Sequence, residues 1–166
     1  RDQPRSRGLG DVYKRQDYAH TPDALEKVLT ALRETAEHRG GRLWCVFGAG
    51  GDRDPGKRPI MGRVAAELAD VAVVTSDNPR TEEPAVIAQA VAEGAAPARE
   101  RRVVLDRREA IVSAVTEAAA ADVVLIAGKG HEDYQEIQGV KHHFSDVEVV
   151  REAFNERRTR VGGKSA

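Results

Sequence analysis

Residues 71–84 read VAVVTSDNPRTEEP, a short apolar run followed by a polar loop. Four consecutive apolar residues at 71–74 are typical of a strand that is covered on both faces, as in a parallel sheet. The DNP triplet at 77–79 then ends the strand, because these residue types favour turns. A helix is expected from Pro84. The stretch therefore predicts a buried strand, a loop at its carboxyl end and a helix, the unit from which α/β folds are built.

The loop in this stretch has a stiff backbone that suits ligand binding. Pro79 fixes its own φ and keeps Asn78 out of the α region, so the segment that carries Arg80 has few conformations. A guanidinium is planar, always charged and grips a carboxylate through two parallel hydrogen bonds. Open α/β sheets bind ligands at the carboxyl ends of their strands. We therefore expect this loop to receive an acidic small molecule.

The same alternation of strand and helix runs through the rest of the chain. It predicts a single domain with a doubly wound, mainly parallel α/β sheet and an antiparallel edge. The expected strands lie at 43–47, 71–74, 103–105 and 122–127, and a hairpin or antiparallel edge addition at 134–138 and 140–144. The expected helices begin at Pro22 after the cap Thr21, near Ile60, at Pro84, after the cap Asp106 and after the cap Ser145. The helix over 84–91 is expected to turn Val86, Ile87, Ala90 and Val91 inward.

Length and composition limit the function. The 166 residues suit one domain, and 26 Lys and Arg against 27 Asp and Glu give a net charge of −1. That balance offers no global field for nucleic acid or an anionic membrane. No apolar run is long enough to span a membrane, and the N-terminus lacks the layout of a secretory signal, so we expect a cytoplasmic location. We also expect a monomer. The lone Cys45 excludes an internal disulfide and a cysteine cluster.

The chain divides into three segments by composition. Residues 1–16 have no apolar period and are interpreted as disordered or foreign to the fold. Residues 17–155 form the predicted domain. Residues 156–166 are basic and are expected to fray.

A glycine-rich loop, GAGGDRDPGKRP at 48–59, leads from the first expected strand into a helix. It is not a dinucleotide fingerprint, because Arg53 stands where the last glycine belongs. One interpretation is a cradle in which backbone N–H groups and the charges of Arg53, Lys57 and Arg58 bind an anion. The other is a mobile turn with solvated charges, and the residues alone do not separate the two.

A third polar loop, GKGHED at 128–133, follows the last expected strand. It is not a phosphate-binding Walker element, because Gly130 occupies the Ser or Thr position. It leaves its strand in the same sense as the other two loops, so the three are expected to line one rim. His142 and His143 lack a third ligand, so we expect no metal site.

Taken together and in order, the motifs DYAHTPDAL, GGDRDPGKRP, DNPRTEEP and GKGHEDYQ resemble the C-terminal domain of the Mur ligases. The resemblance covers Asp17 to about Phe154 and is closest to the members that add meso-diaminopimelate. In that family this domain is a Rossmann-like lid that carries the incoming amino acid and helps to close over ATP. A central domain holds the triphosphate and Mg²⁺, and an N-terminal domain holds the UDP-sugar peptide.

The resemblance implies roles for individual residues. Those implied to bind diaminopimelate are Arg53, Asp77, Asn78, Pro79, Arg80, Gly128 and Glu132. Asp17 and His20 are implied to approach the ribose and adenine of ATP. The chemistry agrees, since Arg53 and Arg80 suit a distal carboxylate, and Glu132 with the Gly128 carbonyl suits a distal ammonium. No residue is nominated as a catalytic base.

The implied reaction activates the D-glutamyl carboxylate of UDP-N-acetylmuramoyl-L-alanyl-D-glutamate as an acyl phosphate, and the amine of meso-diaminopimelate then attacks it. This domain would position the amino acid. The chain departs from the family before Asp17, where an apolar strand and an arginine-containing linker are expected. It also lacks the central domain, so the isolated chain is expected to be inactive. Two alternatives remain: a free-standing nucleotide or anion-binding module, and a ligase for lysine or another diamine, which Arg80 disfavours.

Overall fold

Four parallel strands form the central sheet of the computed structural model, which describes residues 21–162. Their order is β3-β2-β1-β4. The strands are β1 (Leu43–Phe47), β2 (Val71–Val74), β3 (Glu100–Val103) and β4 (Val123–Ile126). The predictions for residues 1–16, Asp17 and His20 lie outside the described residues.

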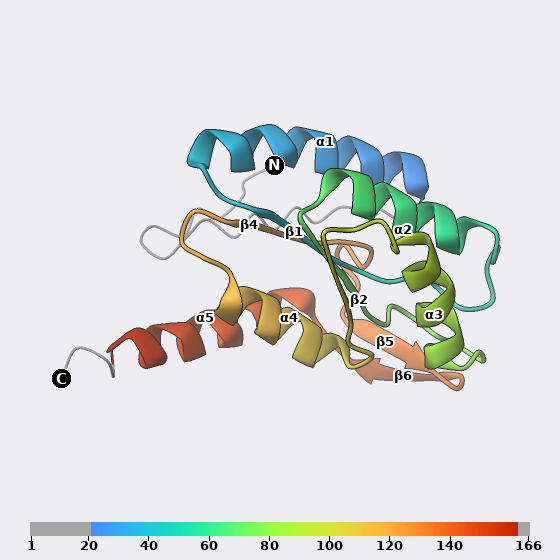
Figure 1. Ribbon diagram of the computed structural model, residues 1–166. Coiled ribbons are helices and arrows are strands. Elements are labelled where there is room, and N and C mark those ends of the chain that lie inside the picture. Colours follow the sequence, from blue (N-terminus) through green and yellow to red (C-terminus); the bar gives the residue numbers. More distant parts are fainter. Residues whose placement is uncertain (1–20, 163–166) are drawn as a thin grey trace.

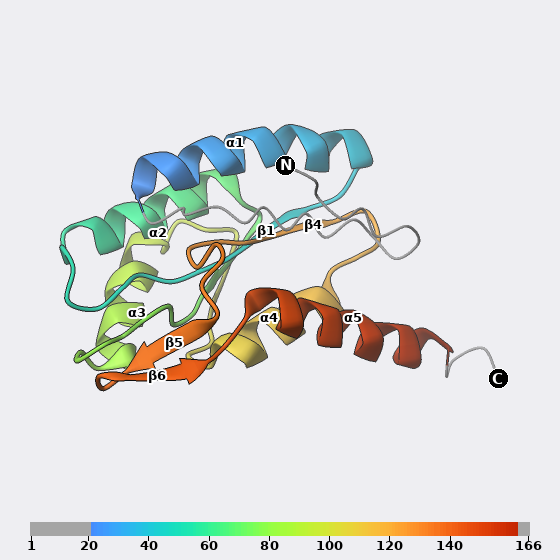
Figure 2. The same ribbon diagram turned by 180° about the vertical axis from the view of Figure 1, so that it is seen from behind.

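Helices cover both faces of the sheet, as Figures 1 and 2 show from opposite sides. One face carries α1 (Pro22–Arg39), α2 (Lys57–Leu68) and α3 (Pro84–Gly94), and the other carries α4 (Arg107–Glu117) and α5 (Asp146–Gly162). Every residue of β1, β2 and β4 is buried, because successive side chains enter the two cores in turn. Cys45 packs with the α1–α3 layer and Trp44 with the α4–α5 layer. The predicted doubly wound, Rossmann-like α/β fold is confirmed.

The strand order reverses between β1 and β4, which makes that position the topological switch point. The parallel registers pair Phe47 with Val74 and Val46 with Ile126. The three strands therefore end at nearly the same level. The loops that follow them emerge at one edge of the sheet, as the sequence predicts.

The predicted hairpin forms, and it is a separate antiparallel two-stranded sheet rather than an addition to the edge of the main sheet. Within residues 21–162, strands β5 (Tyr134–Ile137) and β6 (Val140–His143) pair with each other, and the one further bridge joins Ile137 to Arg80. The Arg80 N–H donates to the Glu136 carbonyl at 2.9 Å, and the Gln138 N–H donates to the Arg80 carbonyl at 2.7 Å. The hairpin therefore docks on the loop after β2, beside α3 and α4 (Figure 1), through the N–H and C=O groups of Arg80.

Three local predictions are wrong. The third strand is Glu100–Val103 rather than 103–105, because register with β2 decides which residues pair. Val86 is 59% exposed rather than inward, since Ile87 and Ala88 take the inner face of α3. The last helix does not end near 155 but continues to Gly162 as α5, in which Arg157 donates to the carbonyls of Val115 and Ala118.

Helix ends follow the local sequence. Thr21 Oγ1 accepts from the Ala24 N–H at 3.2 Å, and the Asp106 carboxylate accepts from the Glu109 N–H at 2.9 Å. Gly40 ends α1 with a φ of 70°, which costs glycine little. These caps agree with the predictions.

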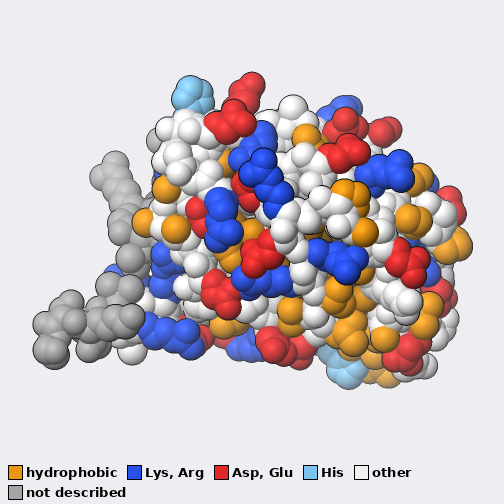
Figure 3. All heavy atoms as spheres, in the orientation of Figure 1, with side chains coloured by type: hydrophobic (Ala, Val, Ile, Leu, Met, Phe, Trp, Pro, Cys, Tyr) orange, Lys and Arg blue, Asp and Glu red, His pale blue; other side chains and the backbone are white. Residues whose placement is uncertain are grey.

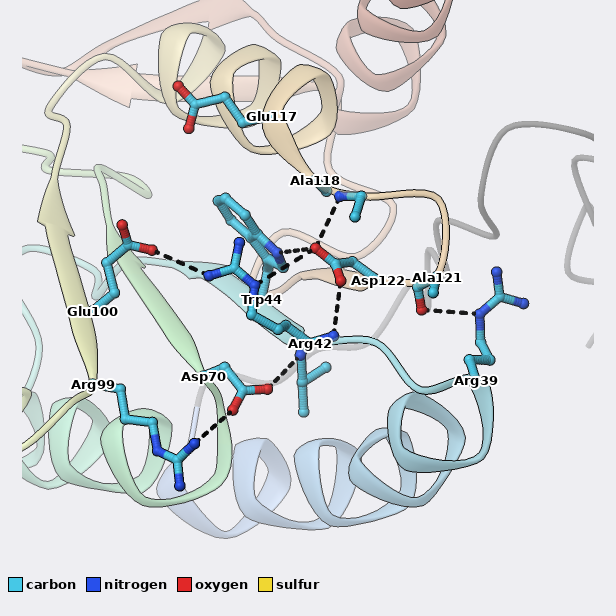
Figure 4. Close-up of polar contacts among 12 residues, drawn as sticks. Arg39, Arg42, Trp44, Asp70, Arg99, Glu100, Glu117, Ala118, Ala121 and Asp122 are labelled. Carbon is cyan, nitrogen blue, oxygen red and sulfur yellow. Dashed lines mark hydrogen bonds and ion pairs between the residues drawn. The ribbon is translucent and has the colours of Figure 1, made fainter.

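The carboxylates of Asp122 and Asp70 link neighbouring segments at the amino ends of the strands (Figure 4). These ends lie opposite the carboxyl ends, from which the three polar loops emerge. Asp122 accepts from the Arg42 N–H at 2.8 Å and from the Trp44 indole at 2.9 Å. Asp70 accepts from the Leu43 N–H at 2.8 Å. The buried Asp122 and the partly exposed Asp70 therefore join β1 to the segments that enter β4 and β2, respectively.

The surface is mixed in charge. On the face in Figure 3, Lys and Arg side chains alternate with Asp and Glu. Within residues 21–162, none of the helices is both long and apolar enough to cross a membrane.

Candidate functional site

A cavity of about 470 Å³ opens at the carboxyl edge of the sheet. Its volume is within the range of small-molecule sites. Five of the predicted binding residues line it, and they come from the loops after β1, β2 and β4: Arg53, Asp77, Asn78, Arg80 and Glu132. The three loops therefore converge on one site at the switch point.

The loop after β1 is held in place by the loop after β2. The Gly51 N–H donates to the Asn78 carbonyl at 2.8 Å, and the Asp52 N–H donates to Glu82 Oε2 at 2.6 Å. Thr81 Oγ1 donates to Asp52 Oδ1 at 2.6 Å, a bond that helps to hold the pKa of Asp52 below its ordinary value. These contacts favour the cradle interpretation over a mobile turn.

Glycine at position 51 is required by the closeness of the two backbones. A Cβ on Gly51 would lie 1.9 Å from the Pro79 carbonyl oxygen, which is far inside contact distance. Pro79 is buried and does not line this cavity. It supports the site through its backbone.

Arg80 is held at both its backbone and its side chain. Its φ is 53°, a left-handed conformation that costs a non-glycine residue energy. Its Nη1 donates to the Gly51 carbonyl at 2.8 Å, and its Nε lies 3.6 Å from Glu136 Oε2. Arg53 lies next to it, because a Cβ on Gly50 would meet Arg80 Nη1 at 2.8 Å and Arg53 Cγ at 3.6 Å. The two guanidinium side chains thus flank one glycine at the cavity wall.

Two acidic groups of the cavity, Asp77 and Glu132, come from the loops after β2 and β4. Asn78 Nδ2 donates to Glu132 Oε2 at 3.1 Å, which links the two loops. Asp77 is 5% exposed and lines the same cavity. Gly128 is not part of the lining, but its φ of 113° and the closeness of Asp77 Oδ2, 2.9 Å from an added Cβ, require glycine there.

The cavity therefore offers charges of both signs. Four cationic side chains line it, Arg53, Lys57, Arg58 and Arg80, and Arg58 is neutralised by Glu82 at 2.6 Å. Three acids line it, Asp54, Asp77 and Glu132. Such a lining suits a zwitterion better than a simple anion. Within residues 21–162, no group of three or more His, Cys, Asp or Glu is placed to hold a metal ion.

Two buried cations near the site are missing from the sequence prediction. Lys129 is fully buried, with its Nζ 2.9 Å from Asn78 Oδ1. Arg107 is also fully buried, and it forms two 2.8 Å bonds with the Asp146 carboxylate. Burial lowers the pKa of Arg107, but Asp146 outweighs it and the net shift is upward. A single Arg or Lys in a polar stretch gives no sequence signal of burial, because solvated cations look the same.

Arg107 joins the strand ends beneath the loops. Its guanidinium donates to the carbonyls of Ser76 and Ala127, each at 3.2 Å. These carbonyls lie just after β2 and β4, respectively. Arg107 therefore holds together the starts of the two loops that supply Asn78 and Glu132.

Comparisons with known proteins agree with this geometry. The family model described as "Mur ligase, glutamate ligase domain" matches residues 7–130, so the match starts inside the 1–16 segment. A Chromobacterium violaceum protein named UDP-N-acetylmuramoyl-L-alanyl-D-glutamate–2,6-diaminopimelate ligase is 61% identical over 137 residues, covering 82% of this chain and 27% of that protein. The Pseudomonas aeruginosa protein of the same name is 57% identical, covering 82% of this chain and 28% of that one.

Solved structures show the same relationship. A structure of a protein with that ligase name superposes with a TM-score of 0.78 at 50% identity, covering 86% of this chain and 29% of that one. Escherichia coli FolC in complex with ADP gives a TM-score of 0.51 at 20% identity, covering 86% of this chain and 29% of that one, and shares the fold alone. The chain thus spans little more than a quarter of the curated relatives it matches. From the family match and these identities, the chain belongs to the Mur ligase family.

Proposed function

We propose that this chain is the amino-acid-binding part of an ATP-dependent ligase that adds meso-diaminopimelate to UDP-N-acetylmuramoyl-L-alanyl-D-glutamate in peptidoglycan synthesis. The Chromobacterium violaceum protein that is named as such a ligase is 61% identical to this chain over 137 residues. The proposed enzyme works in the cytoplasm as a monomer, and Asp17 and His20 approach its ATP.

One observation carries the proposal: Arg53, Arg80 and Glu132 line a single cavity. Diaminopimelate has an amino-acid group at each end, so a selective site must bind one carboxylate and one ammonium far from the reacting amine. Arginine pairs with carboxylate in two parallel bonds, and a carboxylate side chain accepts from ammonium. The cavity supplies both, with Asp77 and Asn78 beside Glu132.

The contribution of this domain to catalysis is positioning. A substrate whose distal end is clasped presents its free amine in a limited set of orientations, which converts an encounter into a near-attack geometry. In this proposal the phosphate chemistry, with ATP and Mg²⁺, belongs to the part of the enzyme that this chain does not span.

The experiment is an exchange of segments. Residues 21–162 of this chain replace the matching segment of the Chromobacterium violaceum ligase, and ADP release is measured with meso-diaminopimelate and with lysine. We expect turnover with meso-diaminopimelate and a kcat/KM at least about tenfold lower with lysine, which has no distal carboxylate. Equal kcat/KM values for both would overturn the assignment, and preference for lysine would replace it with the diamine alternative.

The second candidate is a free-standing nucleotide-binding module, favoured by the glycine-rich loop and the two arginines at the cavity. Calorimetry of the 166-residue chain against ATP and against meso-diaminopimelate separates the two functions. Binding of the amino acid without ATP binding supports the ligase part. Tight ATP binding by the chain alone supports the module.

A further inference from the structure

Lys129 is a buried cation directly under the acidic side of the cavity. Its side chain is fully buried, and Nζ lies 2.8 Å from the Tyr134 carbonyl, 2.9 Å from Asn78 Oδ1 and 3.3 Å from Asp77 Oδ1. Glu132 Oε2 lies 3.8 Å away. Burial pushes the pKa of Lys129 below its ordinary value of 10.5, and Asp77 opposes that shift. A solvated lysine would have none of these contacts. Lys129 instead touches three residues that line the cavity, Asp77, Asn78 and Glu132.

The contacts of Lys129 decide which way the Asn78 amide points. Asn78 Oδ1 receives two donors, Lys129 Nζ at 2.9 Å and the Glu136 N–H at 3.0 Å. Neither donor can accept a hydrogen bond, so the oxygen of the amide must face them. The NH₂ group is therefore directed at Glu132 Oε2, 3.1 Å away in the cavity wall.

This orientation gives the wall its chemical polarity. Asn78 presents a donor, which suits a carboxylate, and it holds Glu132, which suits an ammonium. The charge of Lys129 also offsets Asp77, which would otherwise be a nearly buried carboxylate beside a second one. If the amide turned over, its oxygen would face Glu132 and repel it.

We propose that Lys129 is the positioning residue that makes the cavity selective for a diamino dicarboxylic acid, by fixing the Asn78 amide and, through it, Glu132. The role rests on the proposed function, because it specifies how that same site distinguishes its amino acid. Lys129 acts from beneath the wall and has no exposed surface with which to touch a ligand.

Lys129→Met is the main variant, because it keeps most of the aliphatic stem and removes the charge and the donors. Lys141→Met is the matched control. Lys141 is exposed and lies over the same Tyr134 ring, with Nζ 4.5 Å from the ring centroid, compared with 5.9 Å for Lys129. Lys129→Gln keeps an amide donor without the charge and serves as the conservative rescue.

The first readout needs no ligand. Nuclear magnetic resonance of the 166-residue chain follows the Asn78 side-chain NH₂ and its proximity to Glu132. We expect the contact in the wild type, in Lys141→Met and in Lys129→Gln, and its loss in folded Lys129→Met. An unchanged contact in Lys129→Met would overturn the proposal. If Lys129→Met does not fold, Lys129→Gln provides the test. Loss of the contact between Asn78 and Glu132 with unchanged meso-diaminopimelate binding would overturn the proposal. A retained contact with retained binding would support it.

The second readout is calorimetric binding of meso-diaminopimelate. We expect Lys129→Met to bind at least about tenfold more weakly than the wild type, since Asn78 loses its orientation and a buried acid loses its partner. Lys129→Gln should stay within about threefold and Lys141→Met within about twofold of the wild type. Equal losses in the Met and Gln variants would show that the donor does not matter and would overturn the proposal.

A double variant tests whether Lys129 acts through Asn78. When two residues act as one unit, their effects are not additive. We expect Lys129→Met to cost little further binding in an Asn78→Ala background, and full additivity would contradict the proposal. A wild-type chain that fails to bind meso-diaminopimelate would refute the proposed function, while the ligand-free Asn78 readout would still decide the role of Lys129.

Discussion

Arg80 combines two features that are costly for an arginine: a φ of 53° and a partly buried guanidinium. Such strain persists only where the surroundings determine it, and it gathers at ligand sites. Here the hairpin forms hydrogen bonds with both the N–H and the C=O of Arg80. The Gly51 carbonyl accepts a hydrogen bond from the Arg80 side chain. The guanidinium is therefore placed before any ligand arrives.

Arg80→Ala should weaken the use of meso-diaminopimelate by about 2–5 kcal/mol, because a partly buried carboxylate loses its bidentate partner. The measurement is kcat/KM of the exchanged ligase. Arg99→Ala is the control, since Arg99 is 87% exposed at the opposite edge of the sheet. Unchanged kinetics in Arg80→Ala would remove the main reason for assigning diaminopimelate.

Cys45 should be unreactive in the folded chain. It is fully buried in β1, and burial raises the pKa of its thiol, so almost no thiolate forms at neutral pH. A thiol reagent should label the chain only after denaturant is added. Rapid labelling under native conditions would show that β1 is not covered as described.

At the scale of elements, the site depends on two loops that touch through their backbones. The Gly51 N–H bonds to the Asn78 carbonyl, and the hairpin bonds to Arg80 on the other side of the same loop. The loop after β2 is thus held between the loop after β1 and β5. None of these segments would keep its shape alone, because each supplies hydrogen bonds that the next one needs.

Gly51→Ala should separate these loops. Its Cβ would lie 1.9 Å from the Pro79 carbonyl oxygen, so the backbones must move apart, at a cost of about 1–3 kcal/mol in the free energy of unfolding. Binding of meso-diaminopimelate should fall as well. Urea denaturation and calorimetry give the two values.

Gly56→Ala is the matched control for that substitution. Gly56 has a φ of −64°, and its added Cβ would meet only the Asp54 side chain at 3.2 Å. We expect a change in stability of less than about 0.5 kcal/mol. Equal effects of the two substitutions would argue against the close approach at Gly51.

At the scale of the whole molecule, the carboxyl and amino ends of the strands form two edges of the sheet, and these edges differ in function. The carboxyl edge carries the cavity, and the amino edge carries the carboxylates of Asp70, which is partly exposed, and Asp122, which is buried (Figure 4). Burial alone would raise the pKa of each. Hydrogen bonds from backbone N–H groups outweigh it, together with the charges of Arg33 and Arg42, so each pKa lies below the ordinary 3.8.

The stability of the fold should therefore fall in acid. A carboxyl whose pKa is depressed by folding stabilises the fold fully above its ordinary value, and that contribution is lost as the pH falls through the depressed value. Asp122→Ala should cost about 2–4 kcal/mol at pH 7, since the Arg42, Trp44 and Ala119 donors lose their acceptor. The difference from the wild type should shrink as the pH falls below about 4. Glu34→Ala, at an exposed position, is the control, and a difference independent of pH would contradict the assignment.

Local sequence was enough for the element order and for the three loops of the site. Strands of four or five buried residues, the caps Thr21 and Asp106, and the turn residues after each strand act over a few positions, so they can be read along the chain. Parallel strands then bring their carboxyl ends together. This is why the loops that carry Arg53, Arg80 and Glu132 were expected at one rim.

Tertiary structure alone decided which charged side chains are buried and where the hairpin docks. Lys129 and Asn78 are 51 positions apart, and Arg107 and Asp146 are 39 apart. A lysine between two glycines reads as a solvated loop residue until a partner from another strand end is placed beside it. The position of the hairpin could not be predicted for the same reason. It pairs with the backbone at Arg80 and not with an edge strand of the main sheet. Burial of charge and pairing of backbones depend on neighbours in space, and those exist only after the chain has folded.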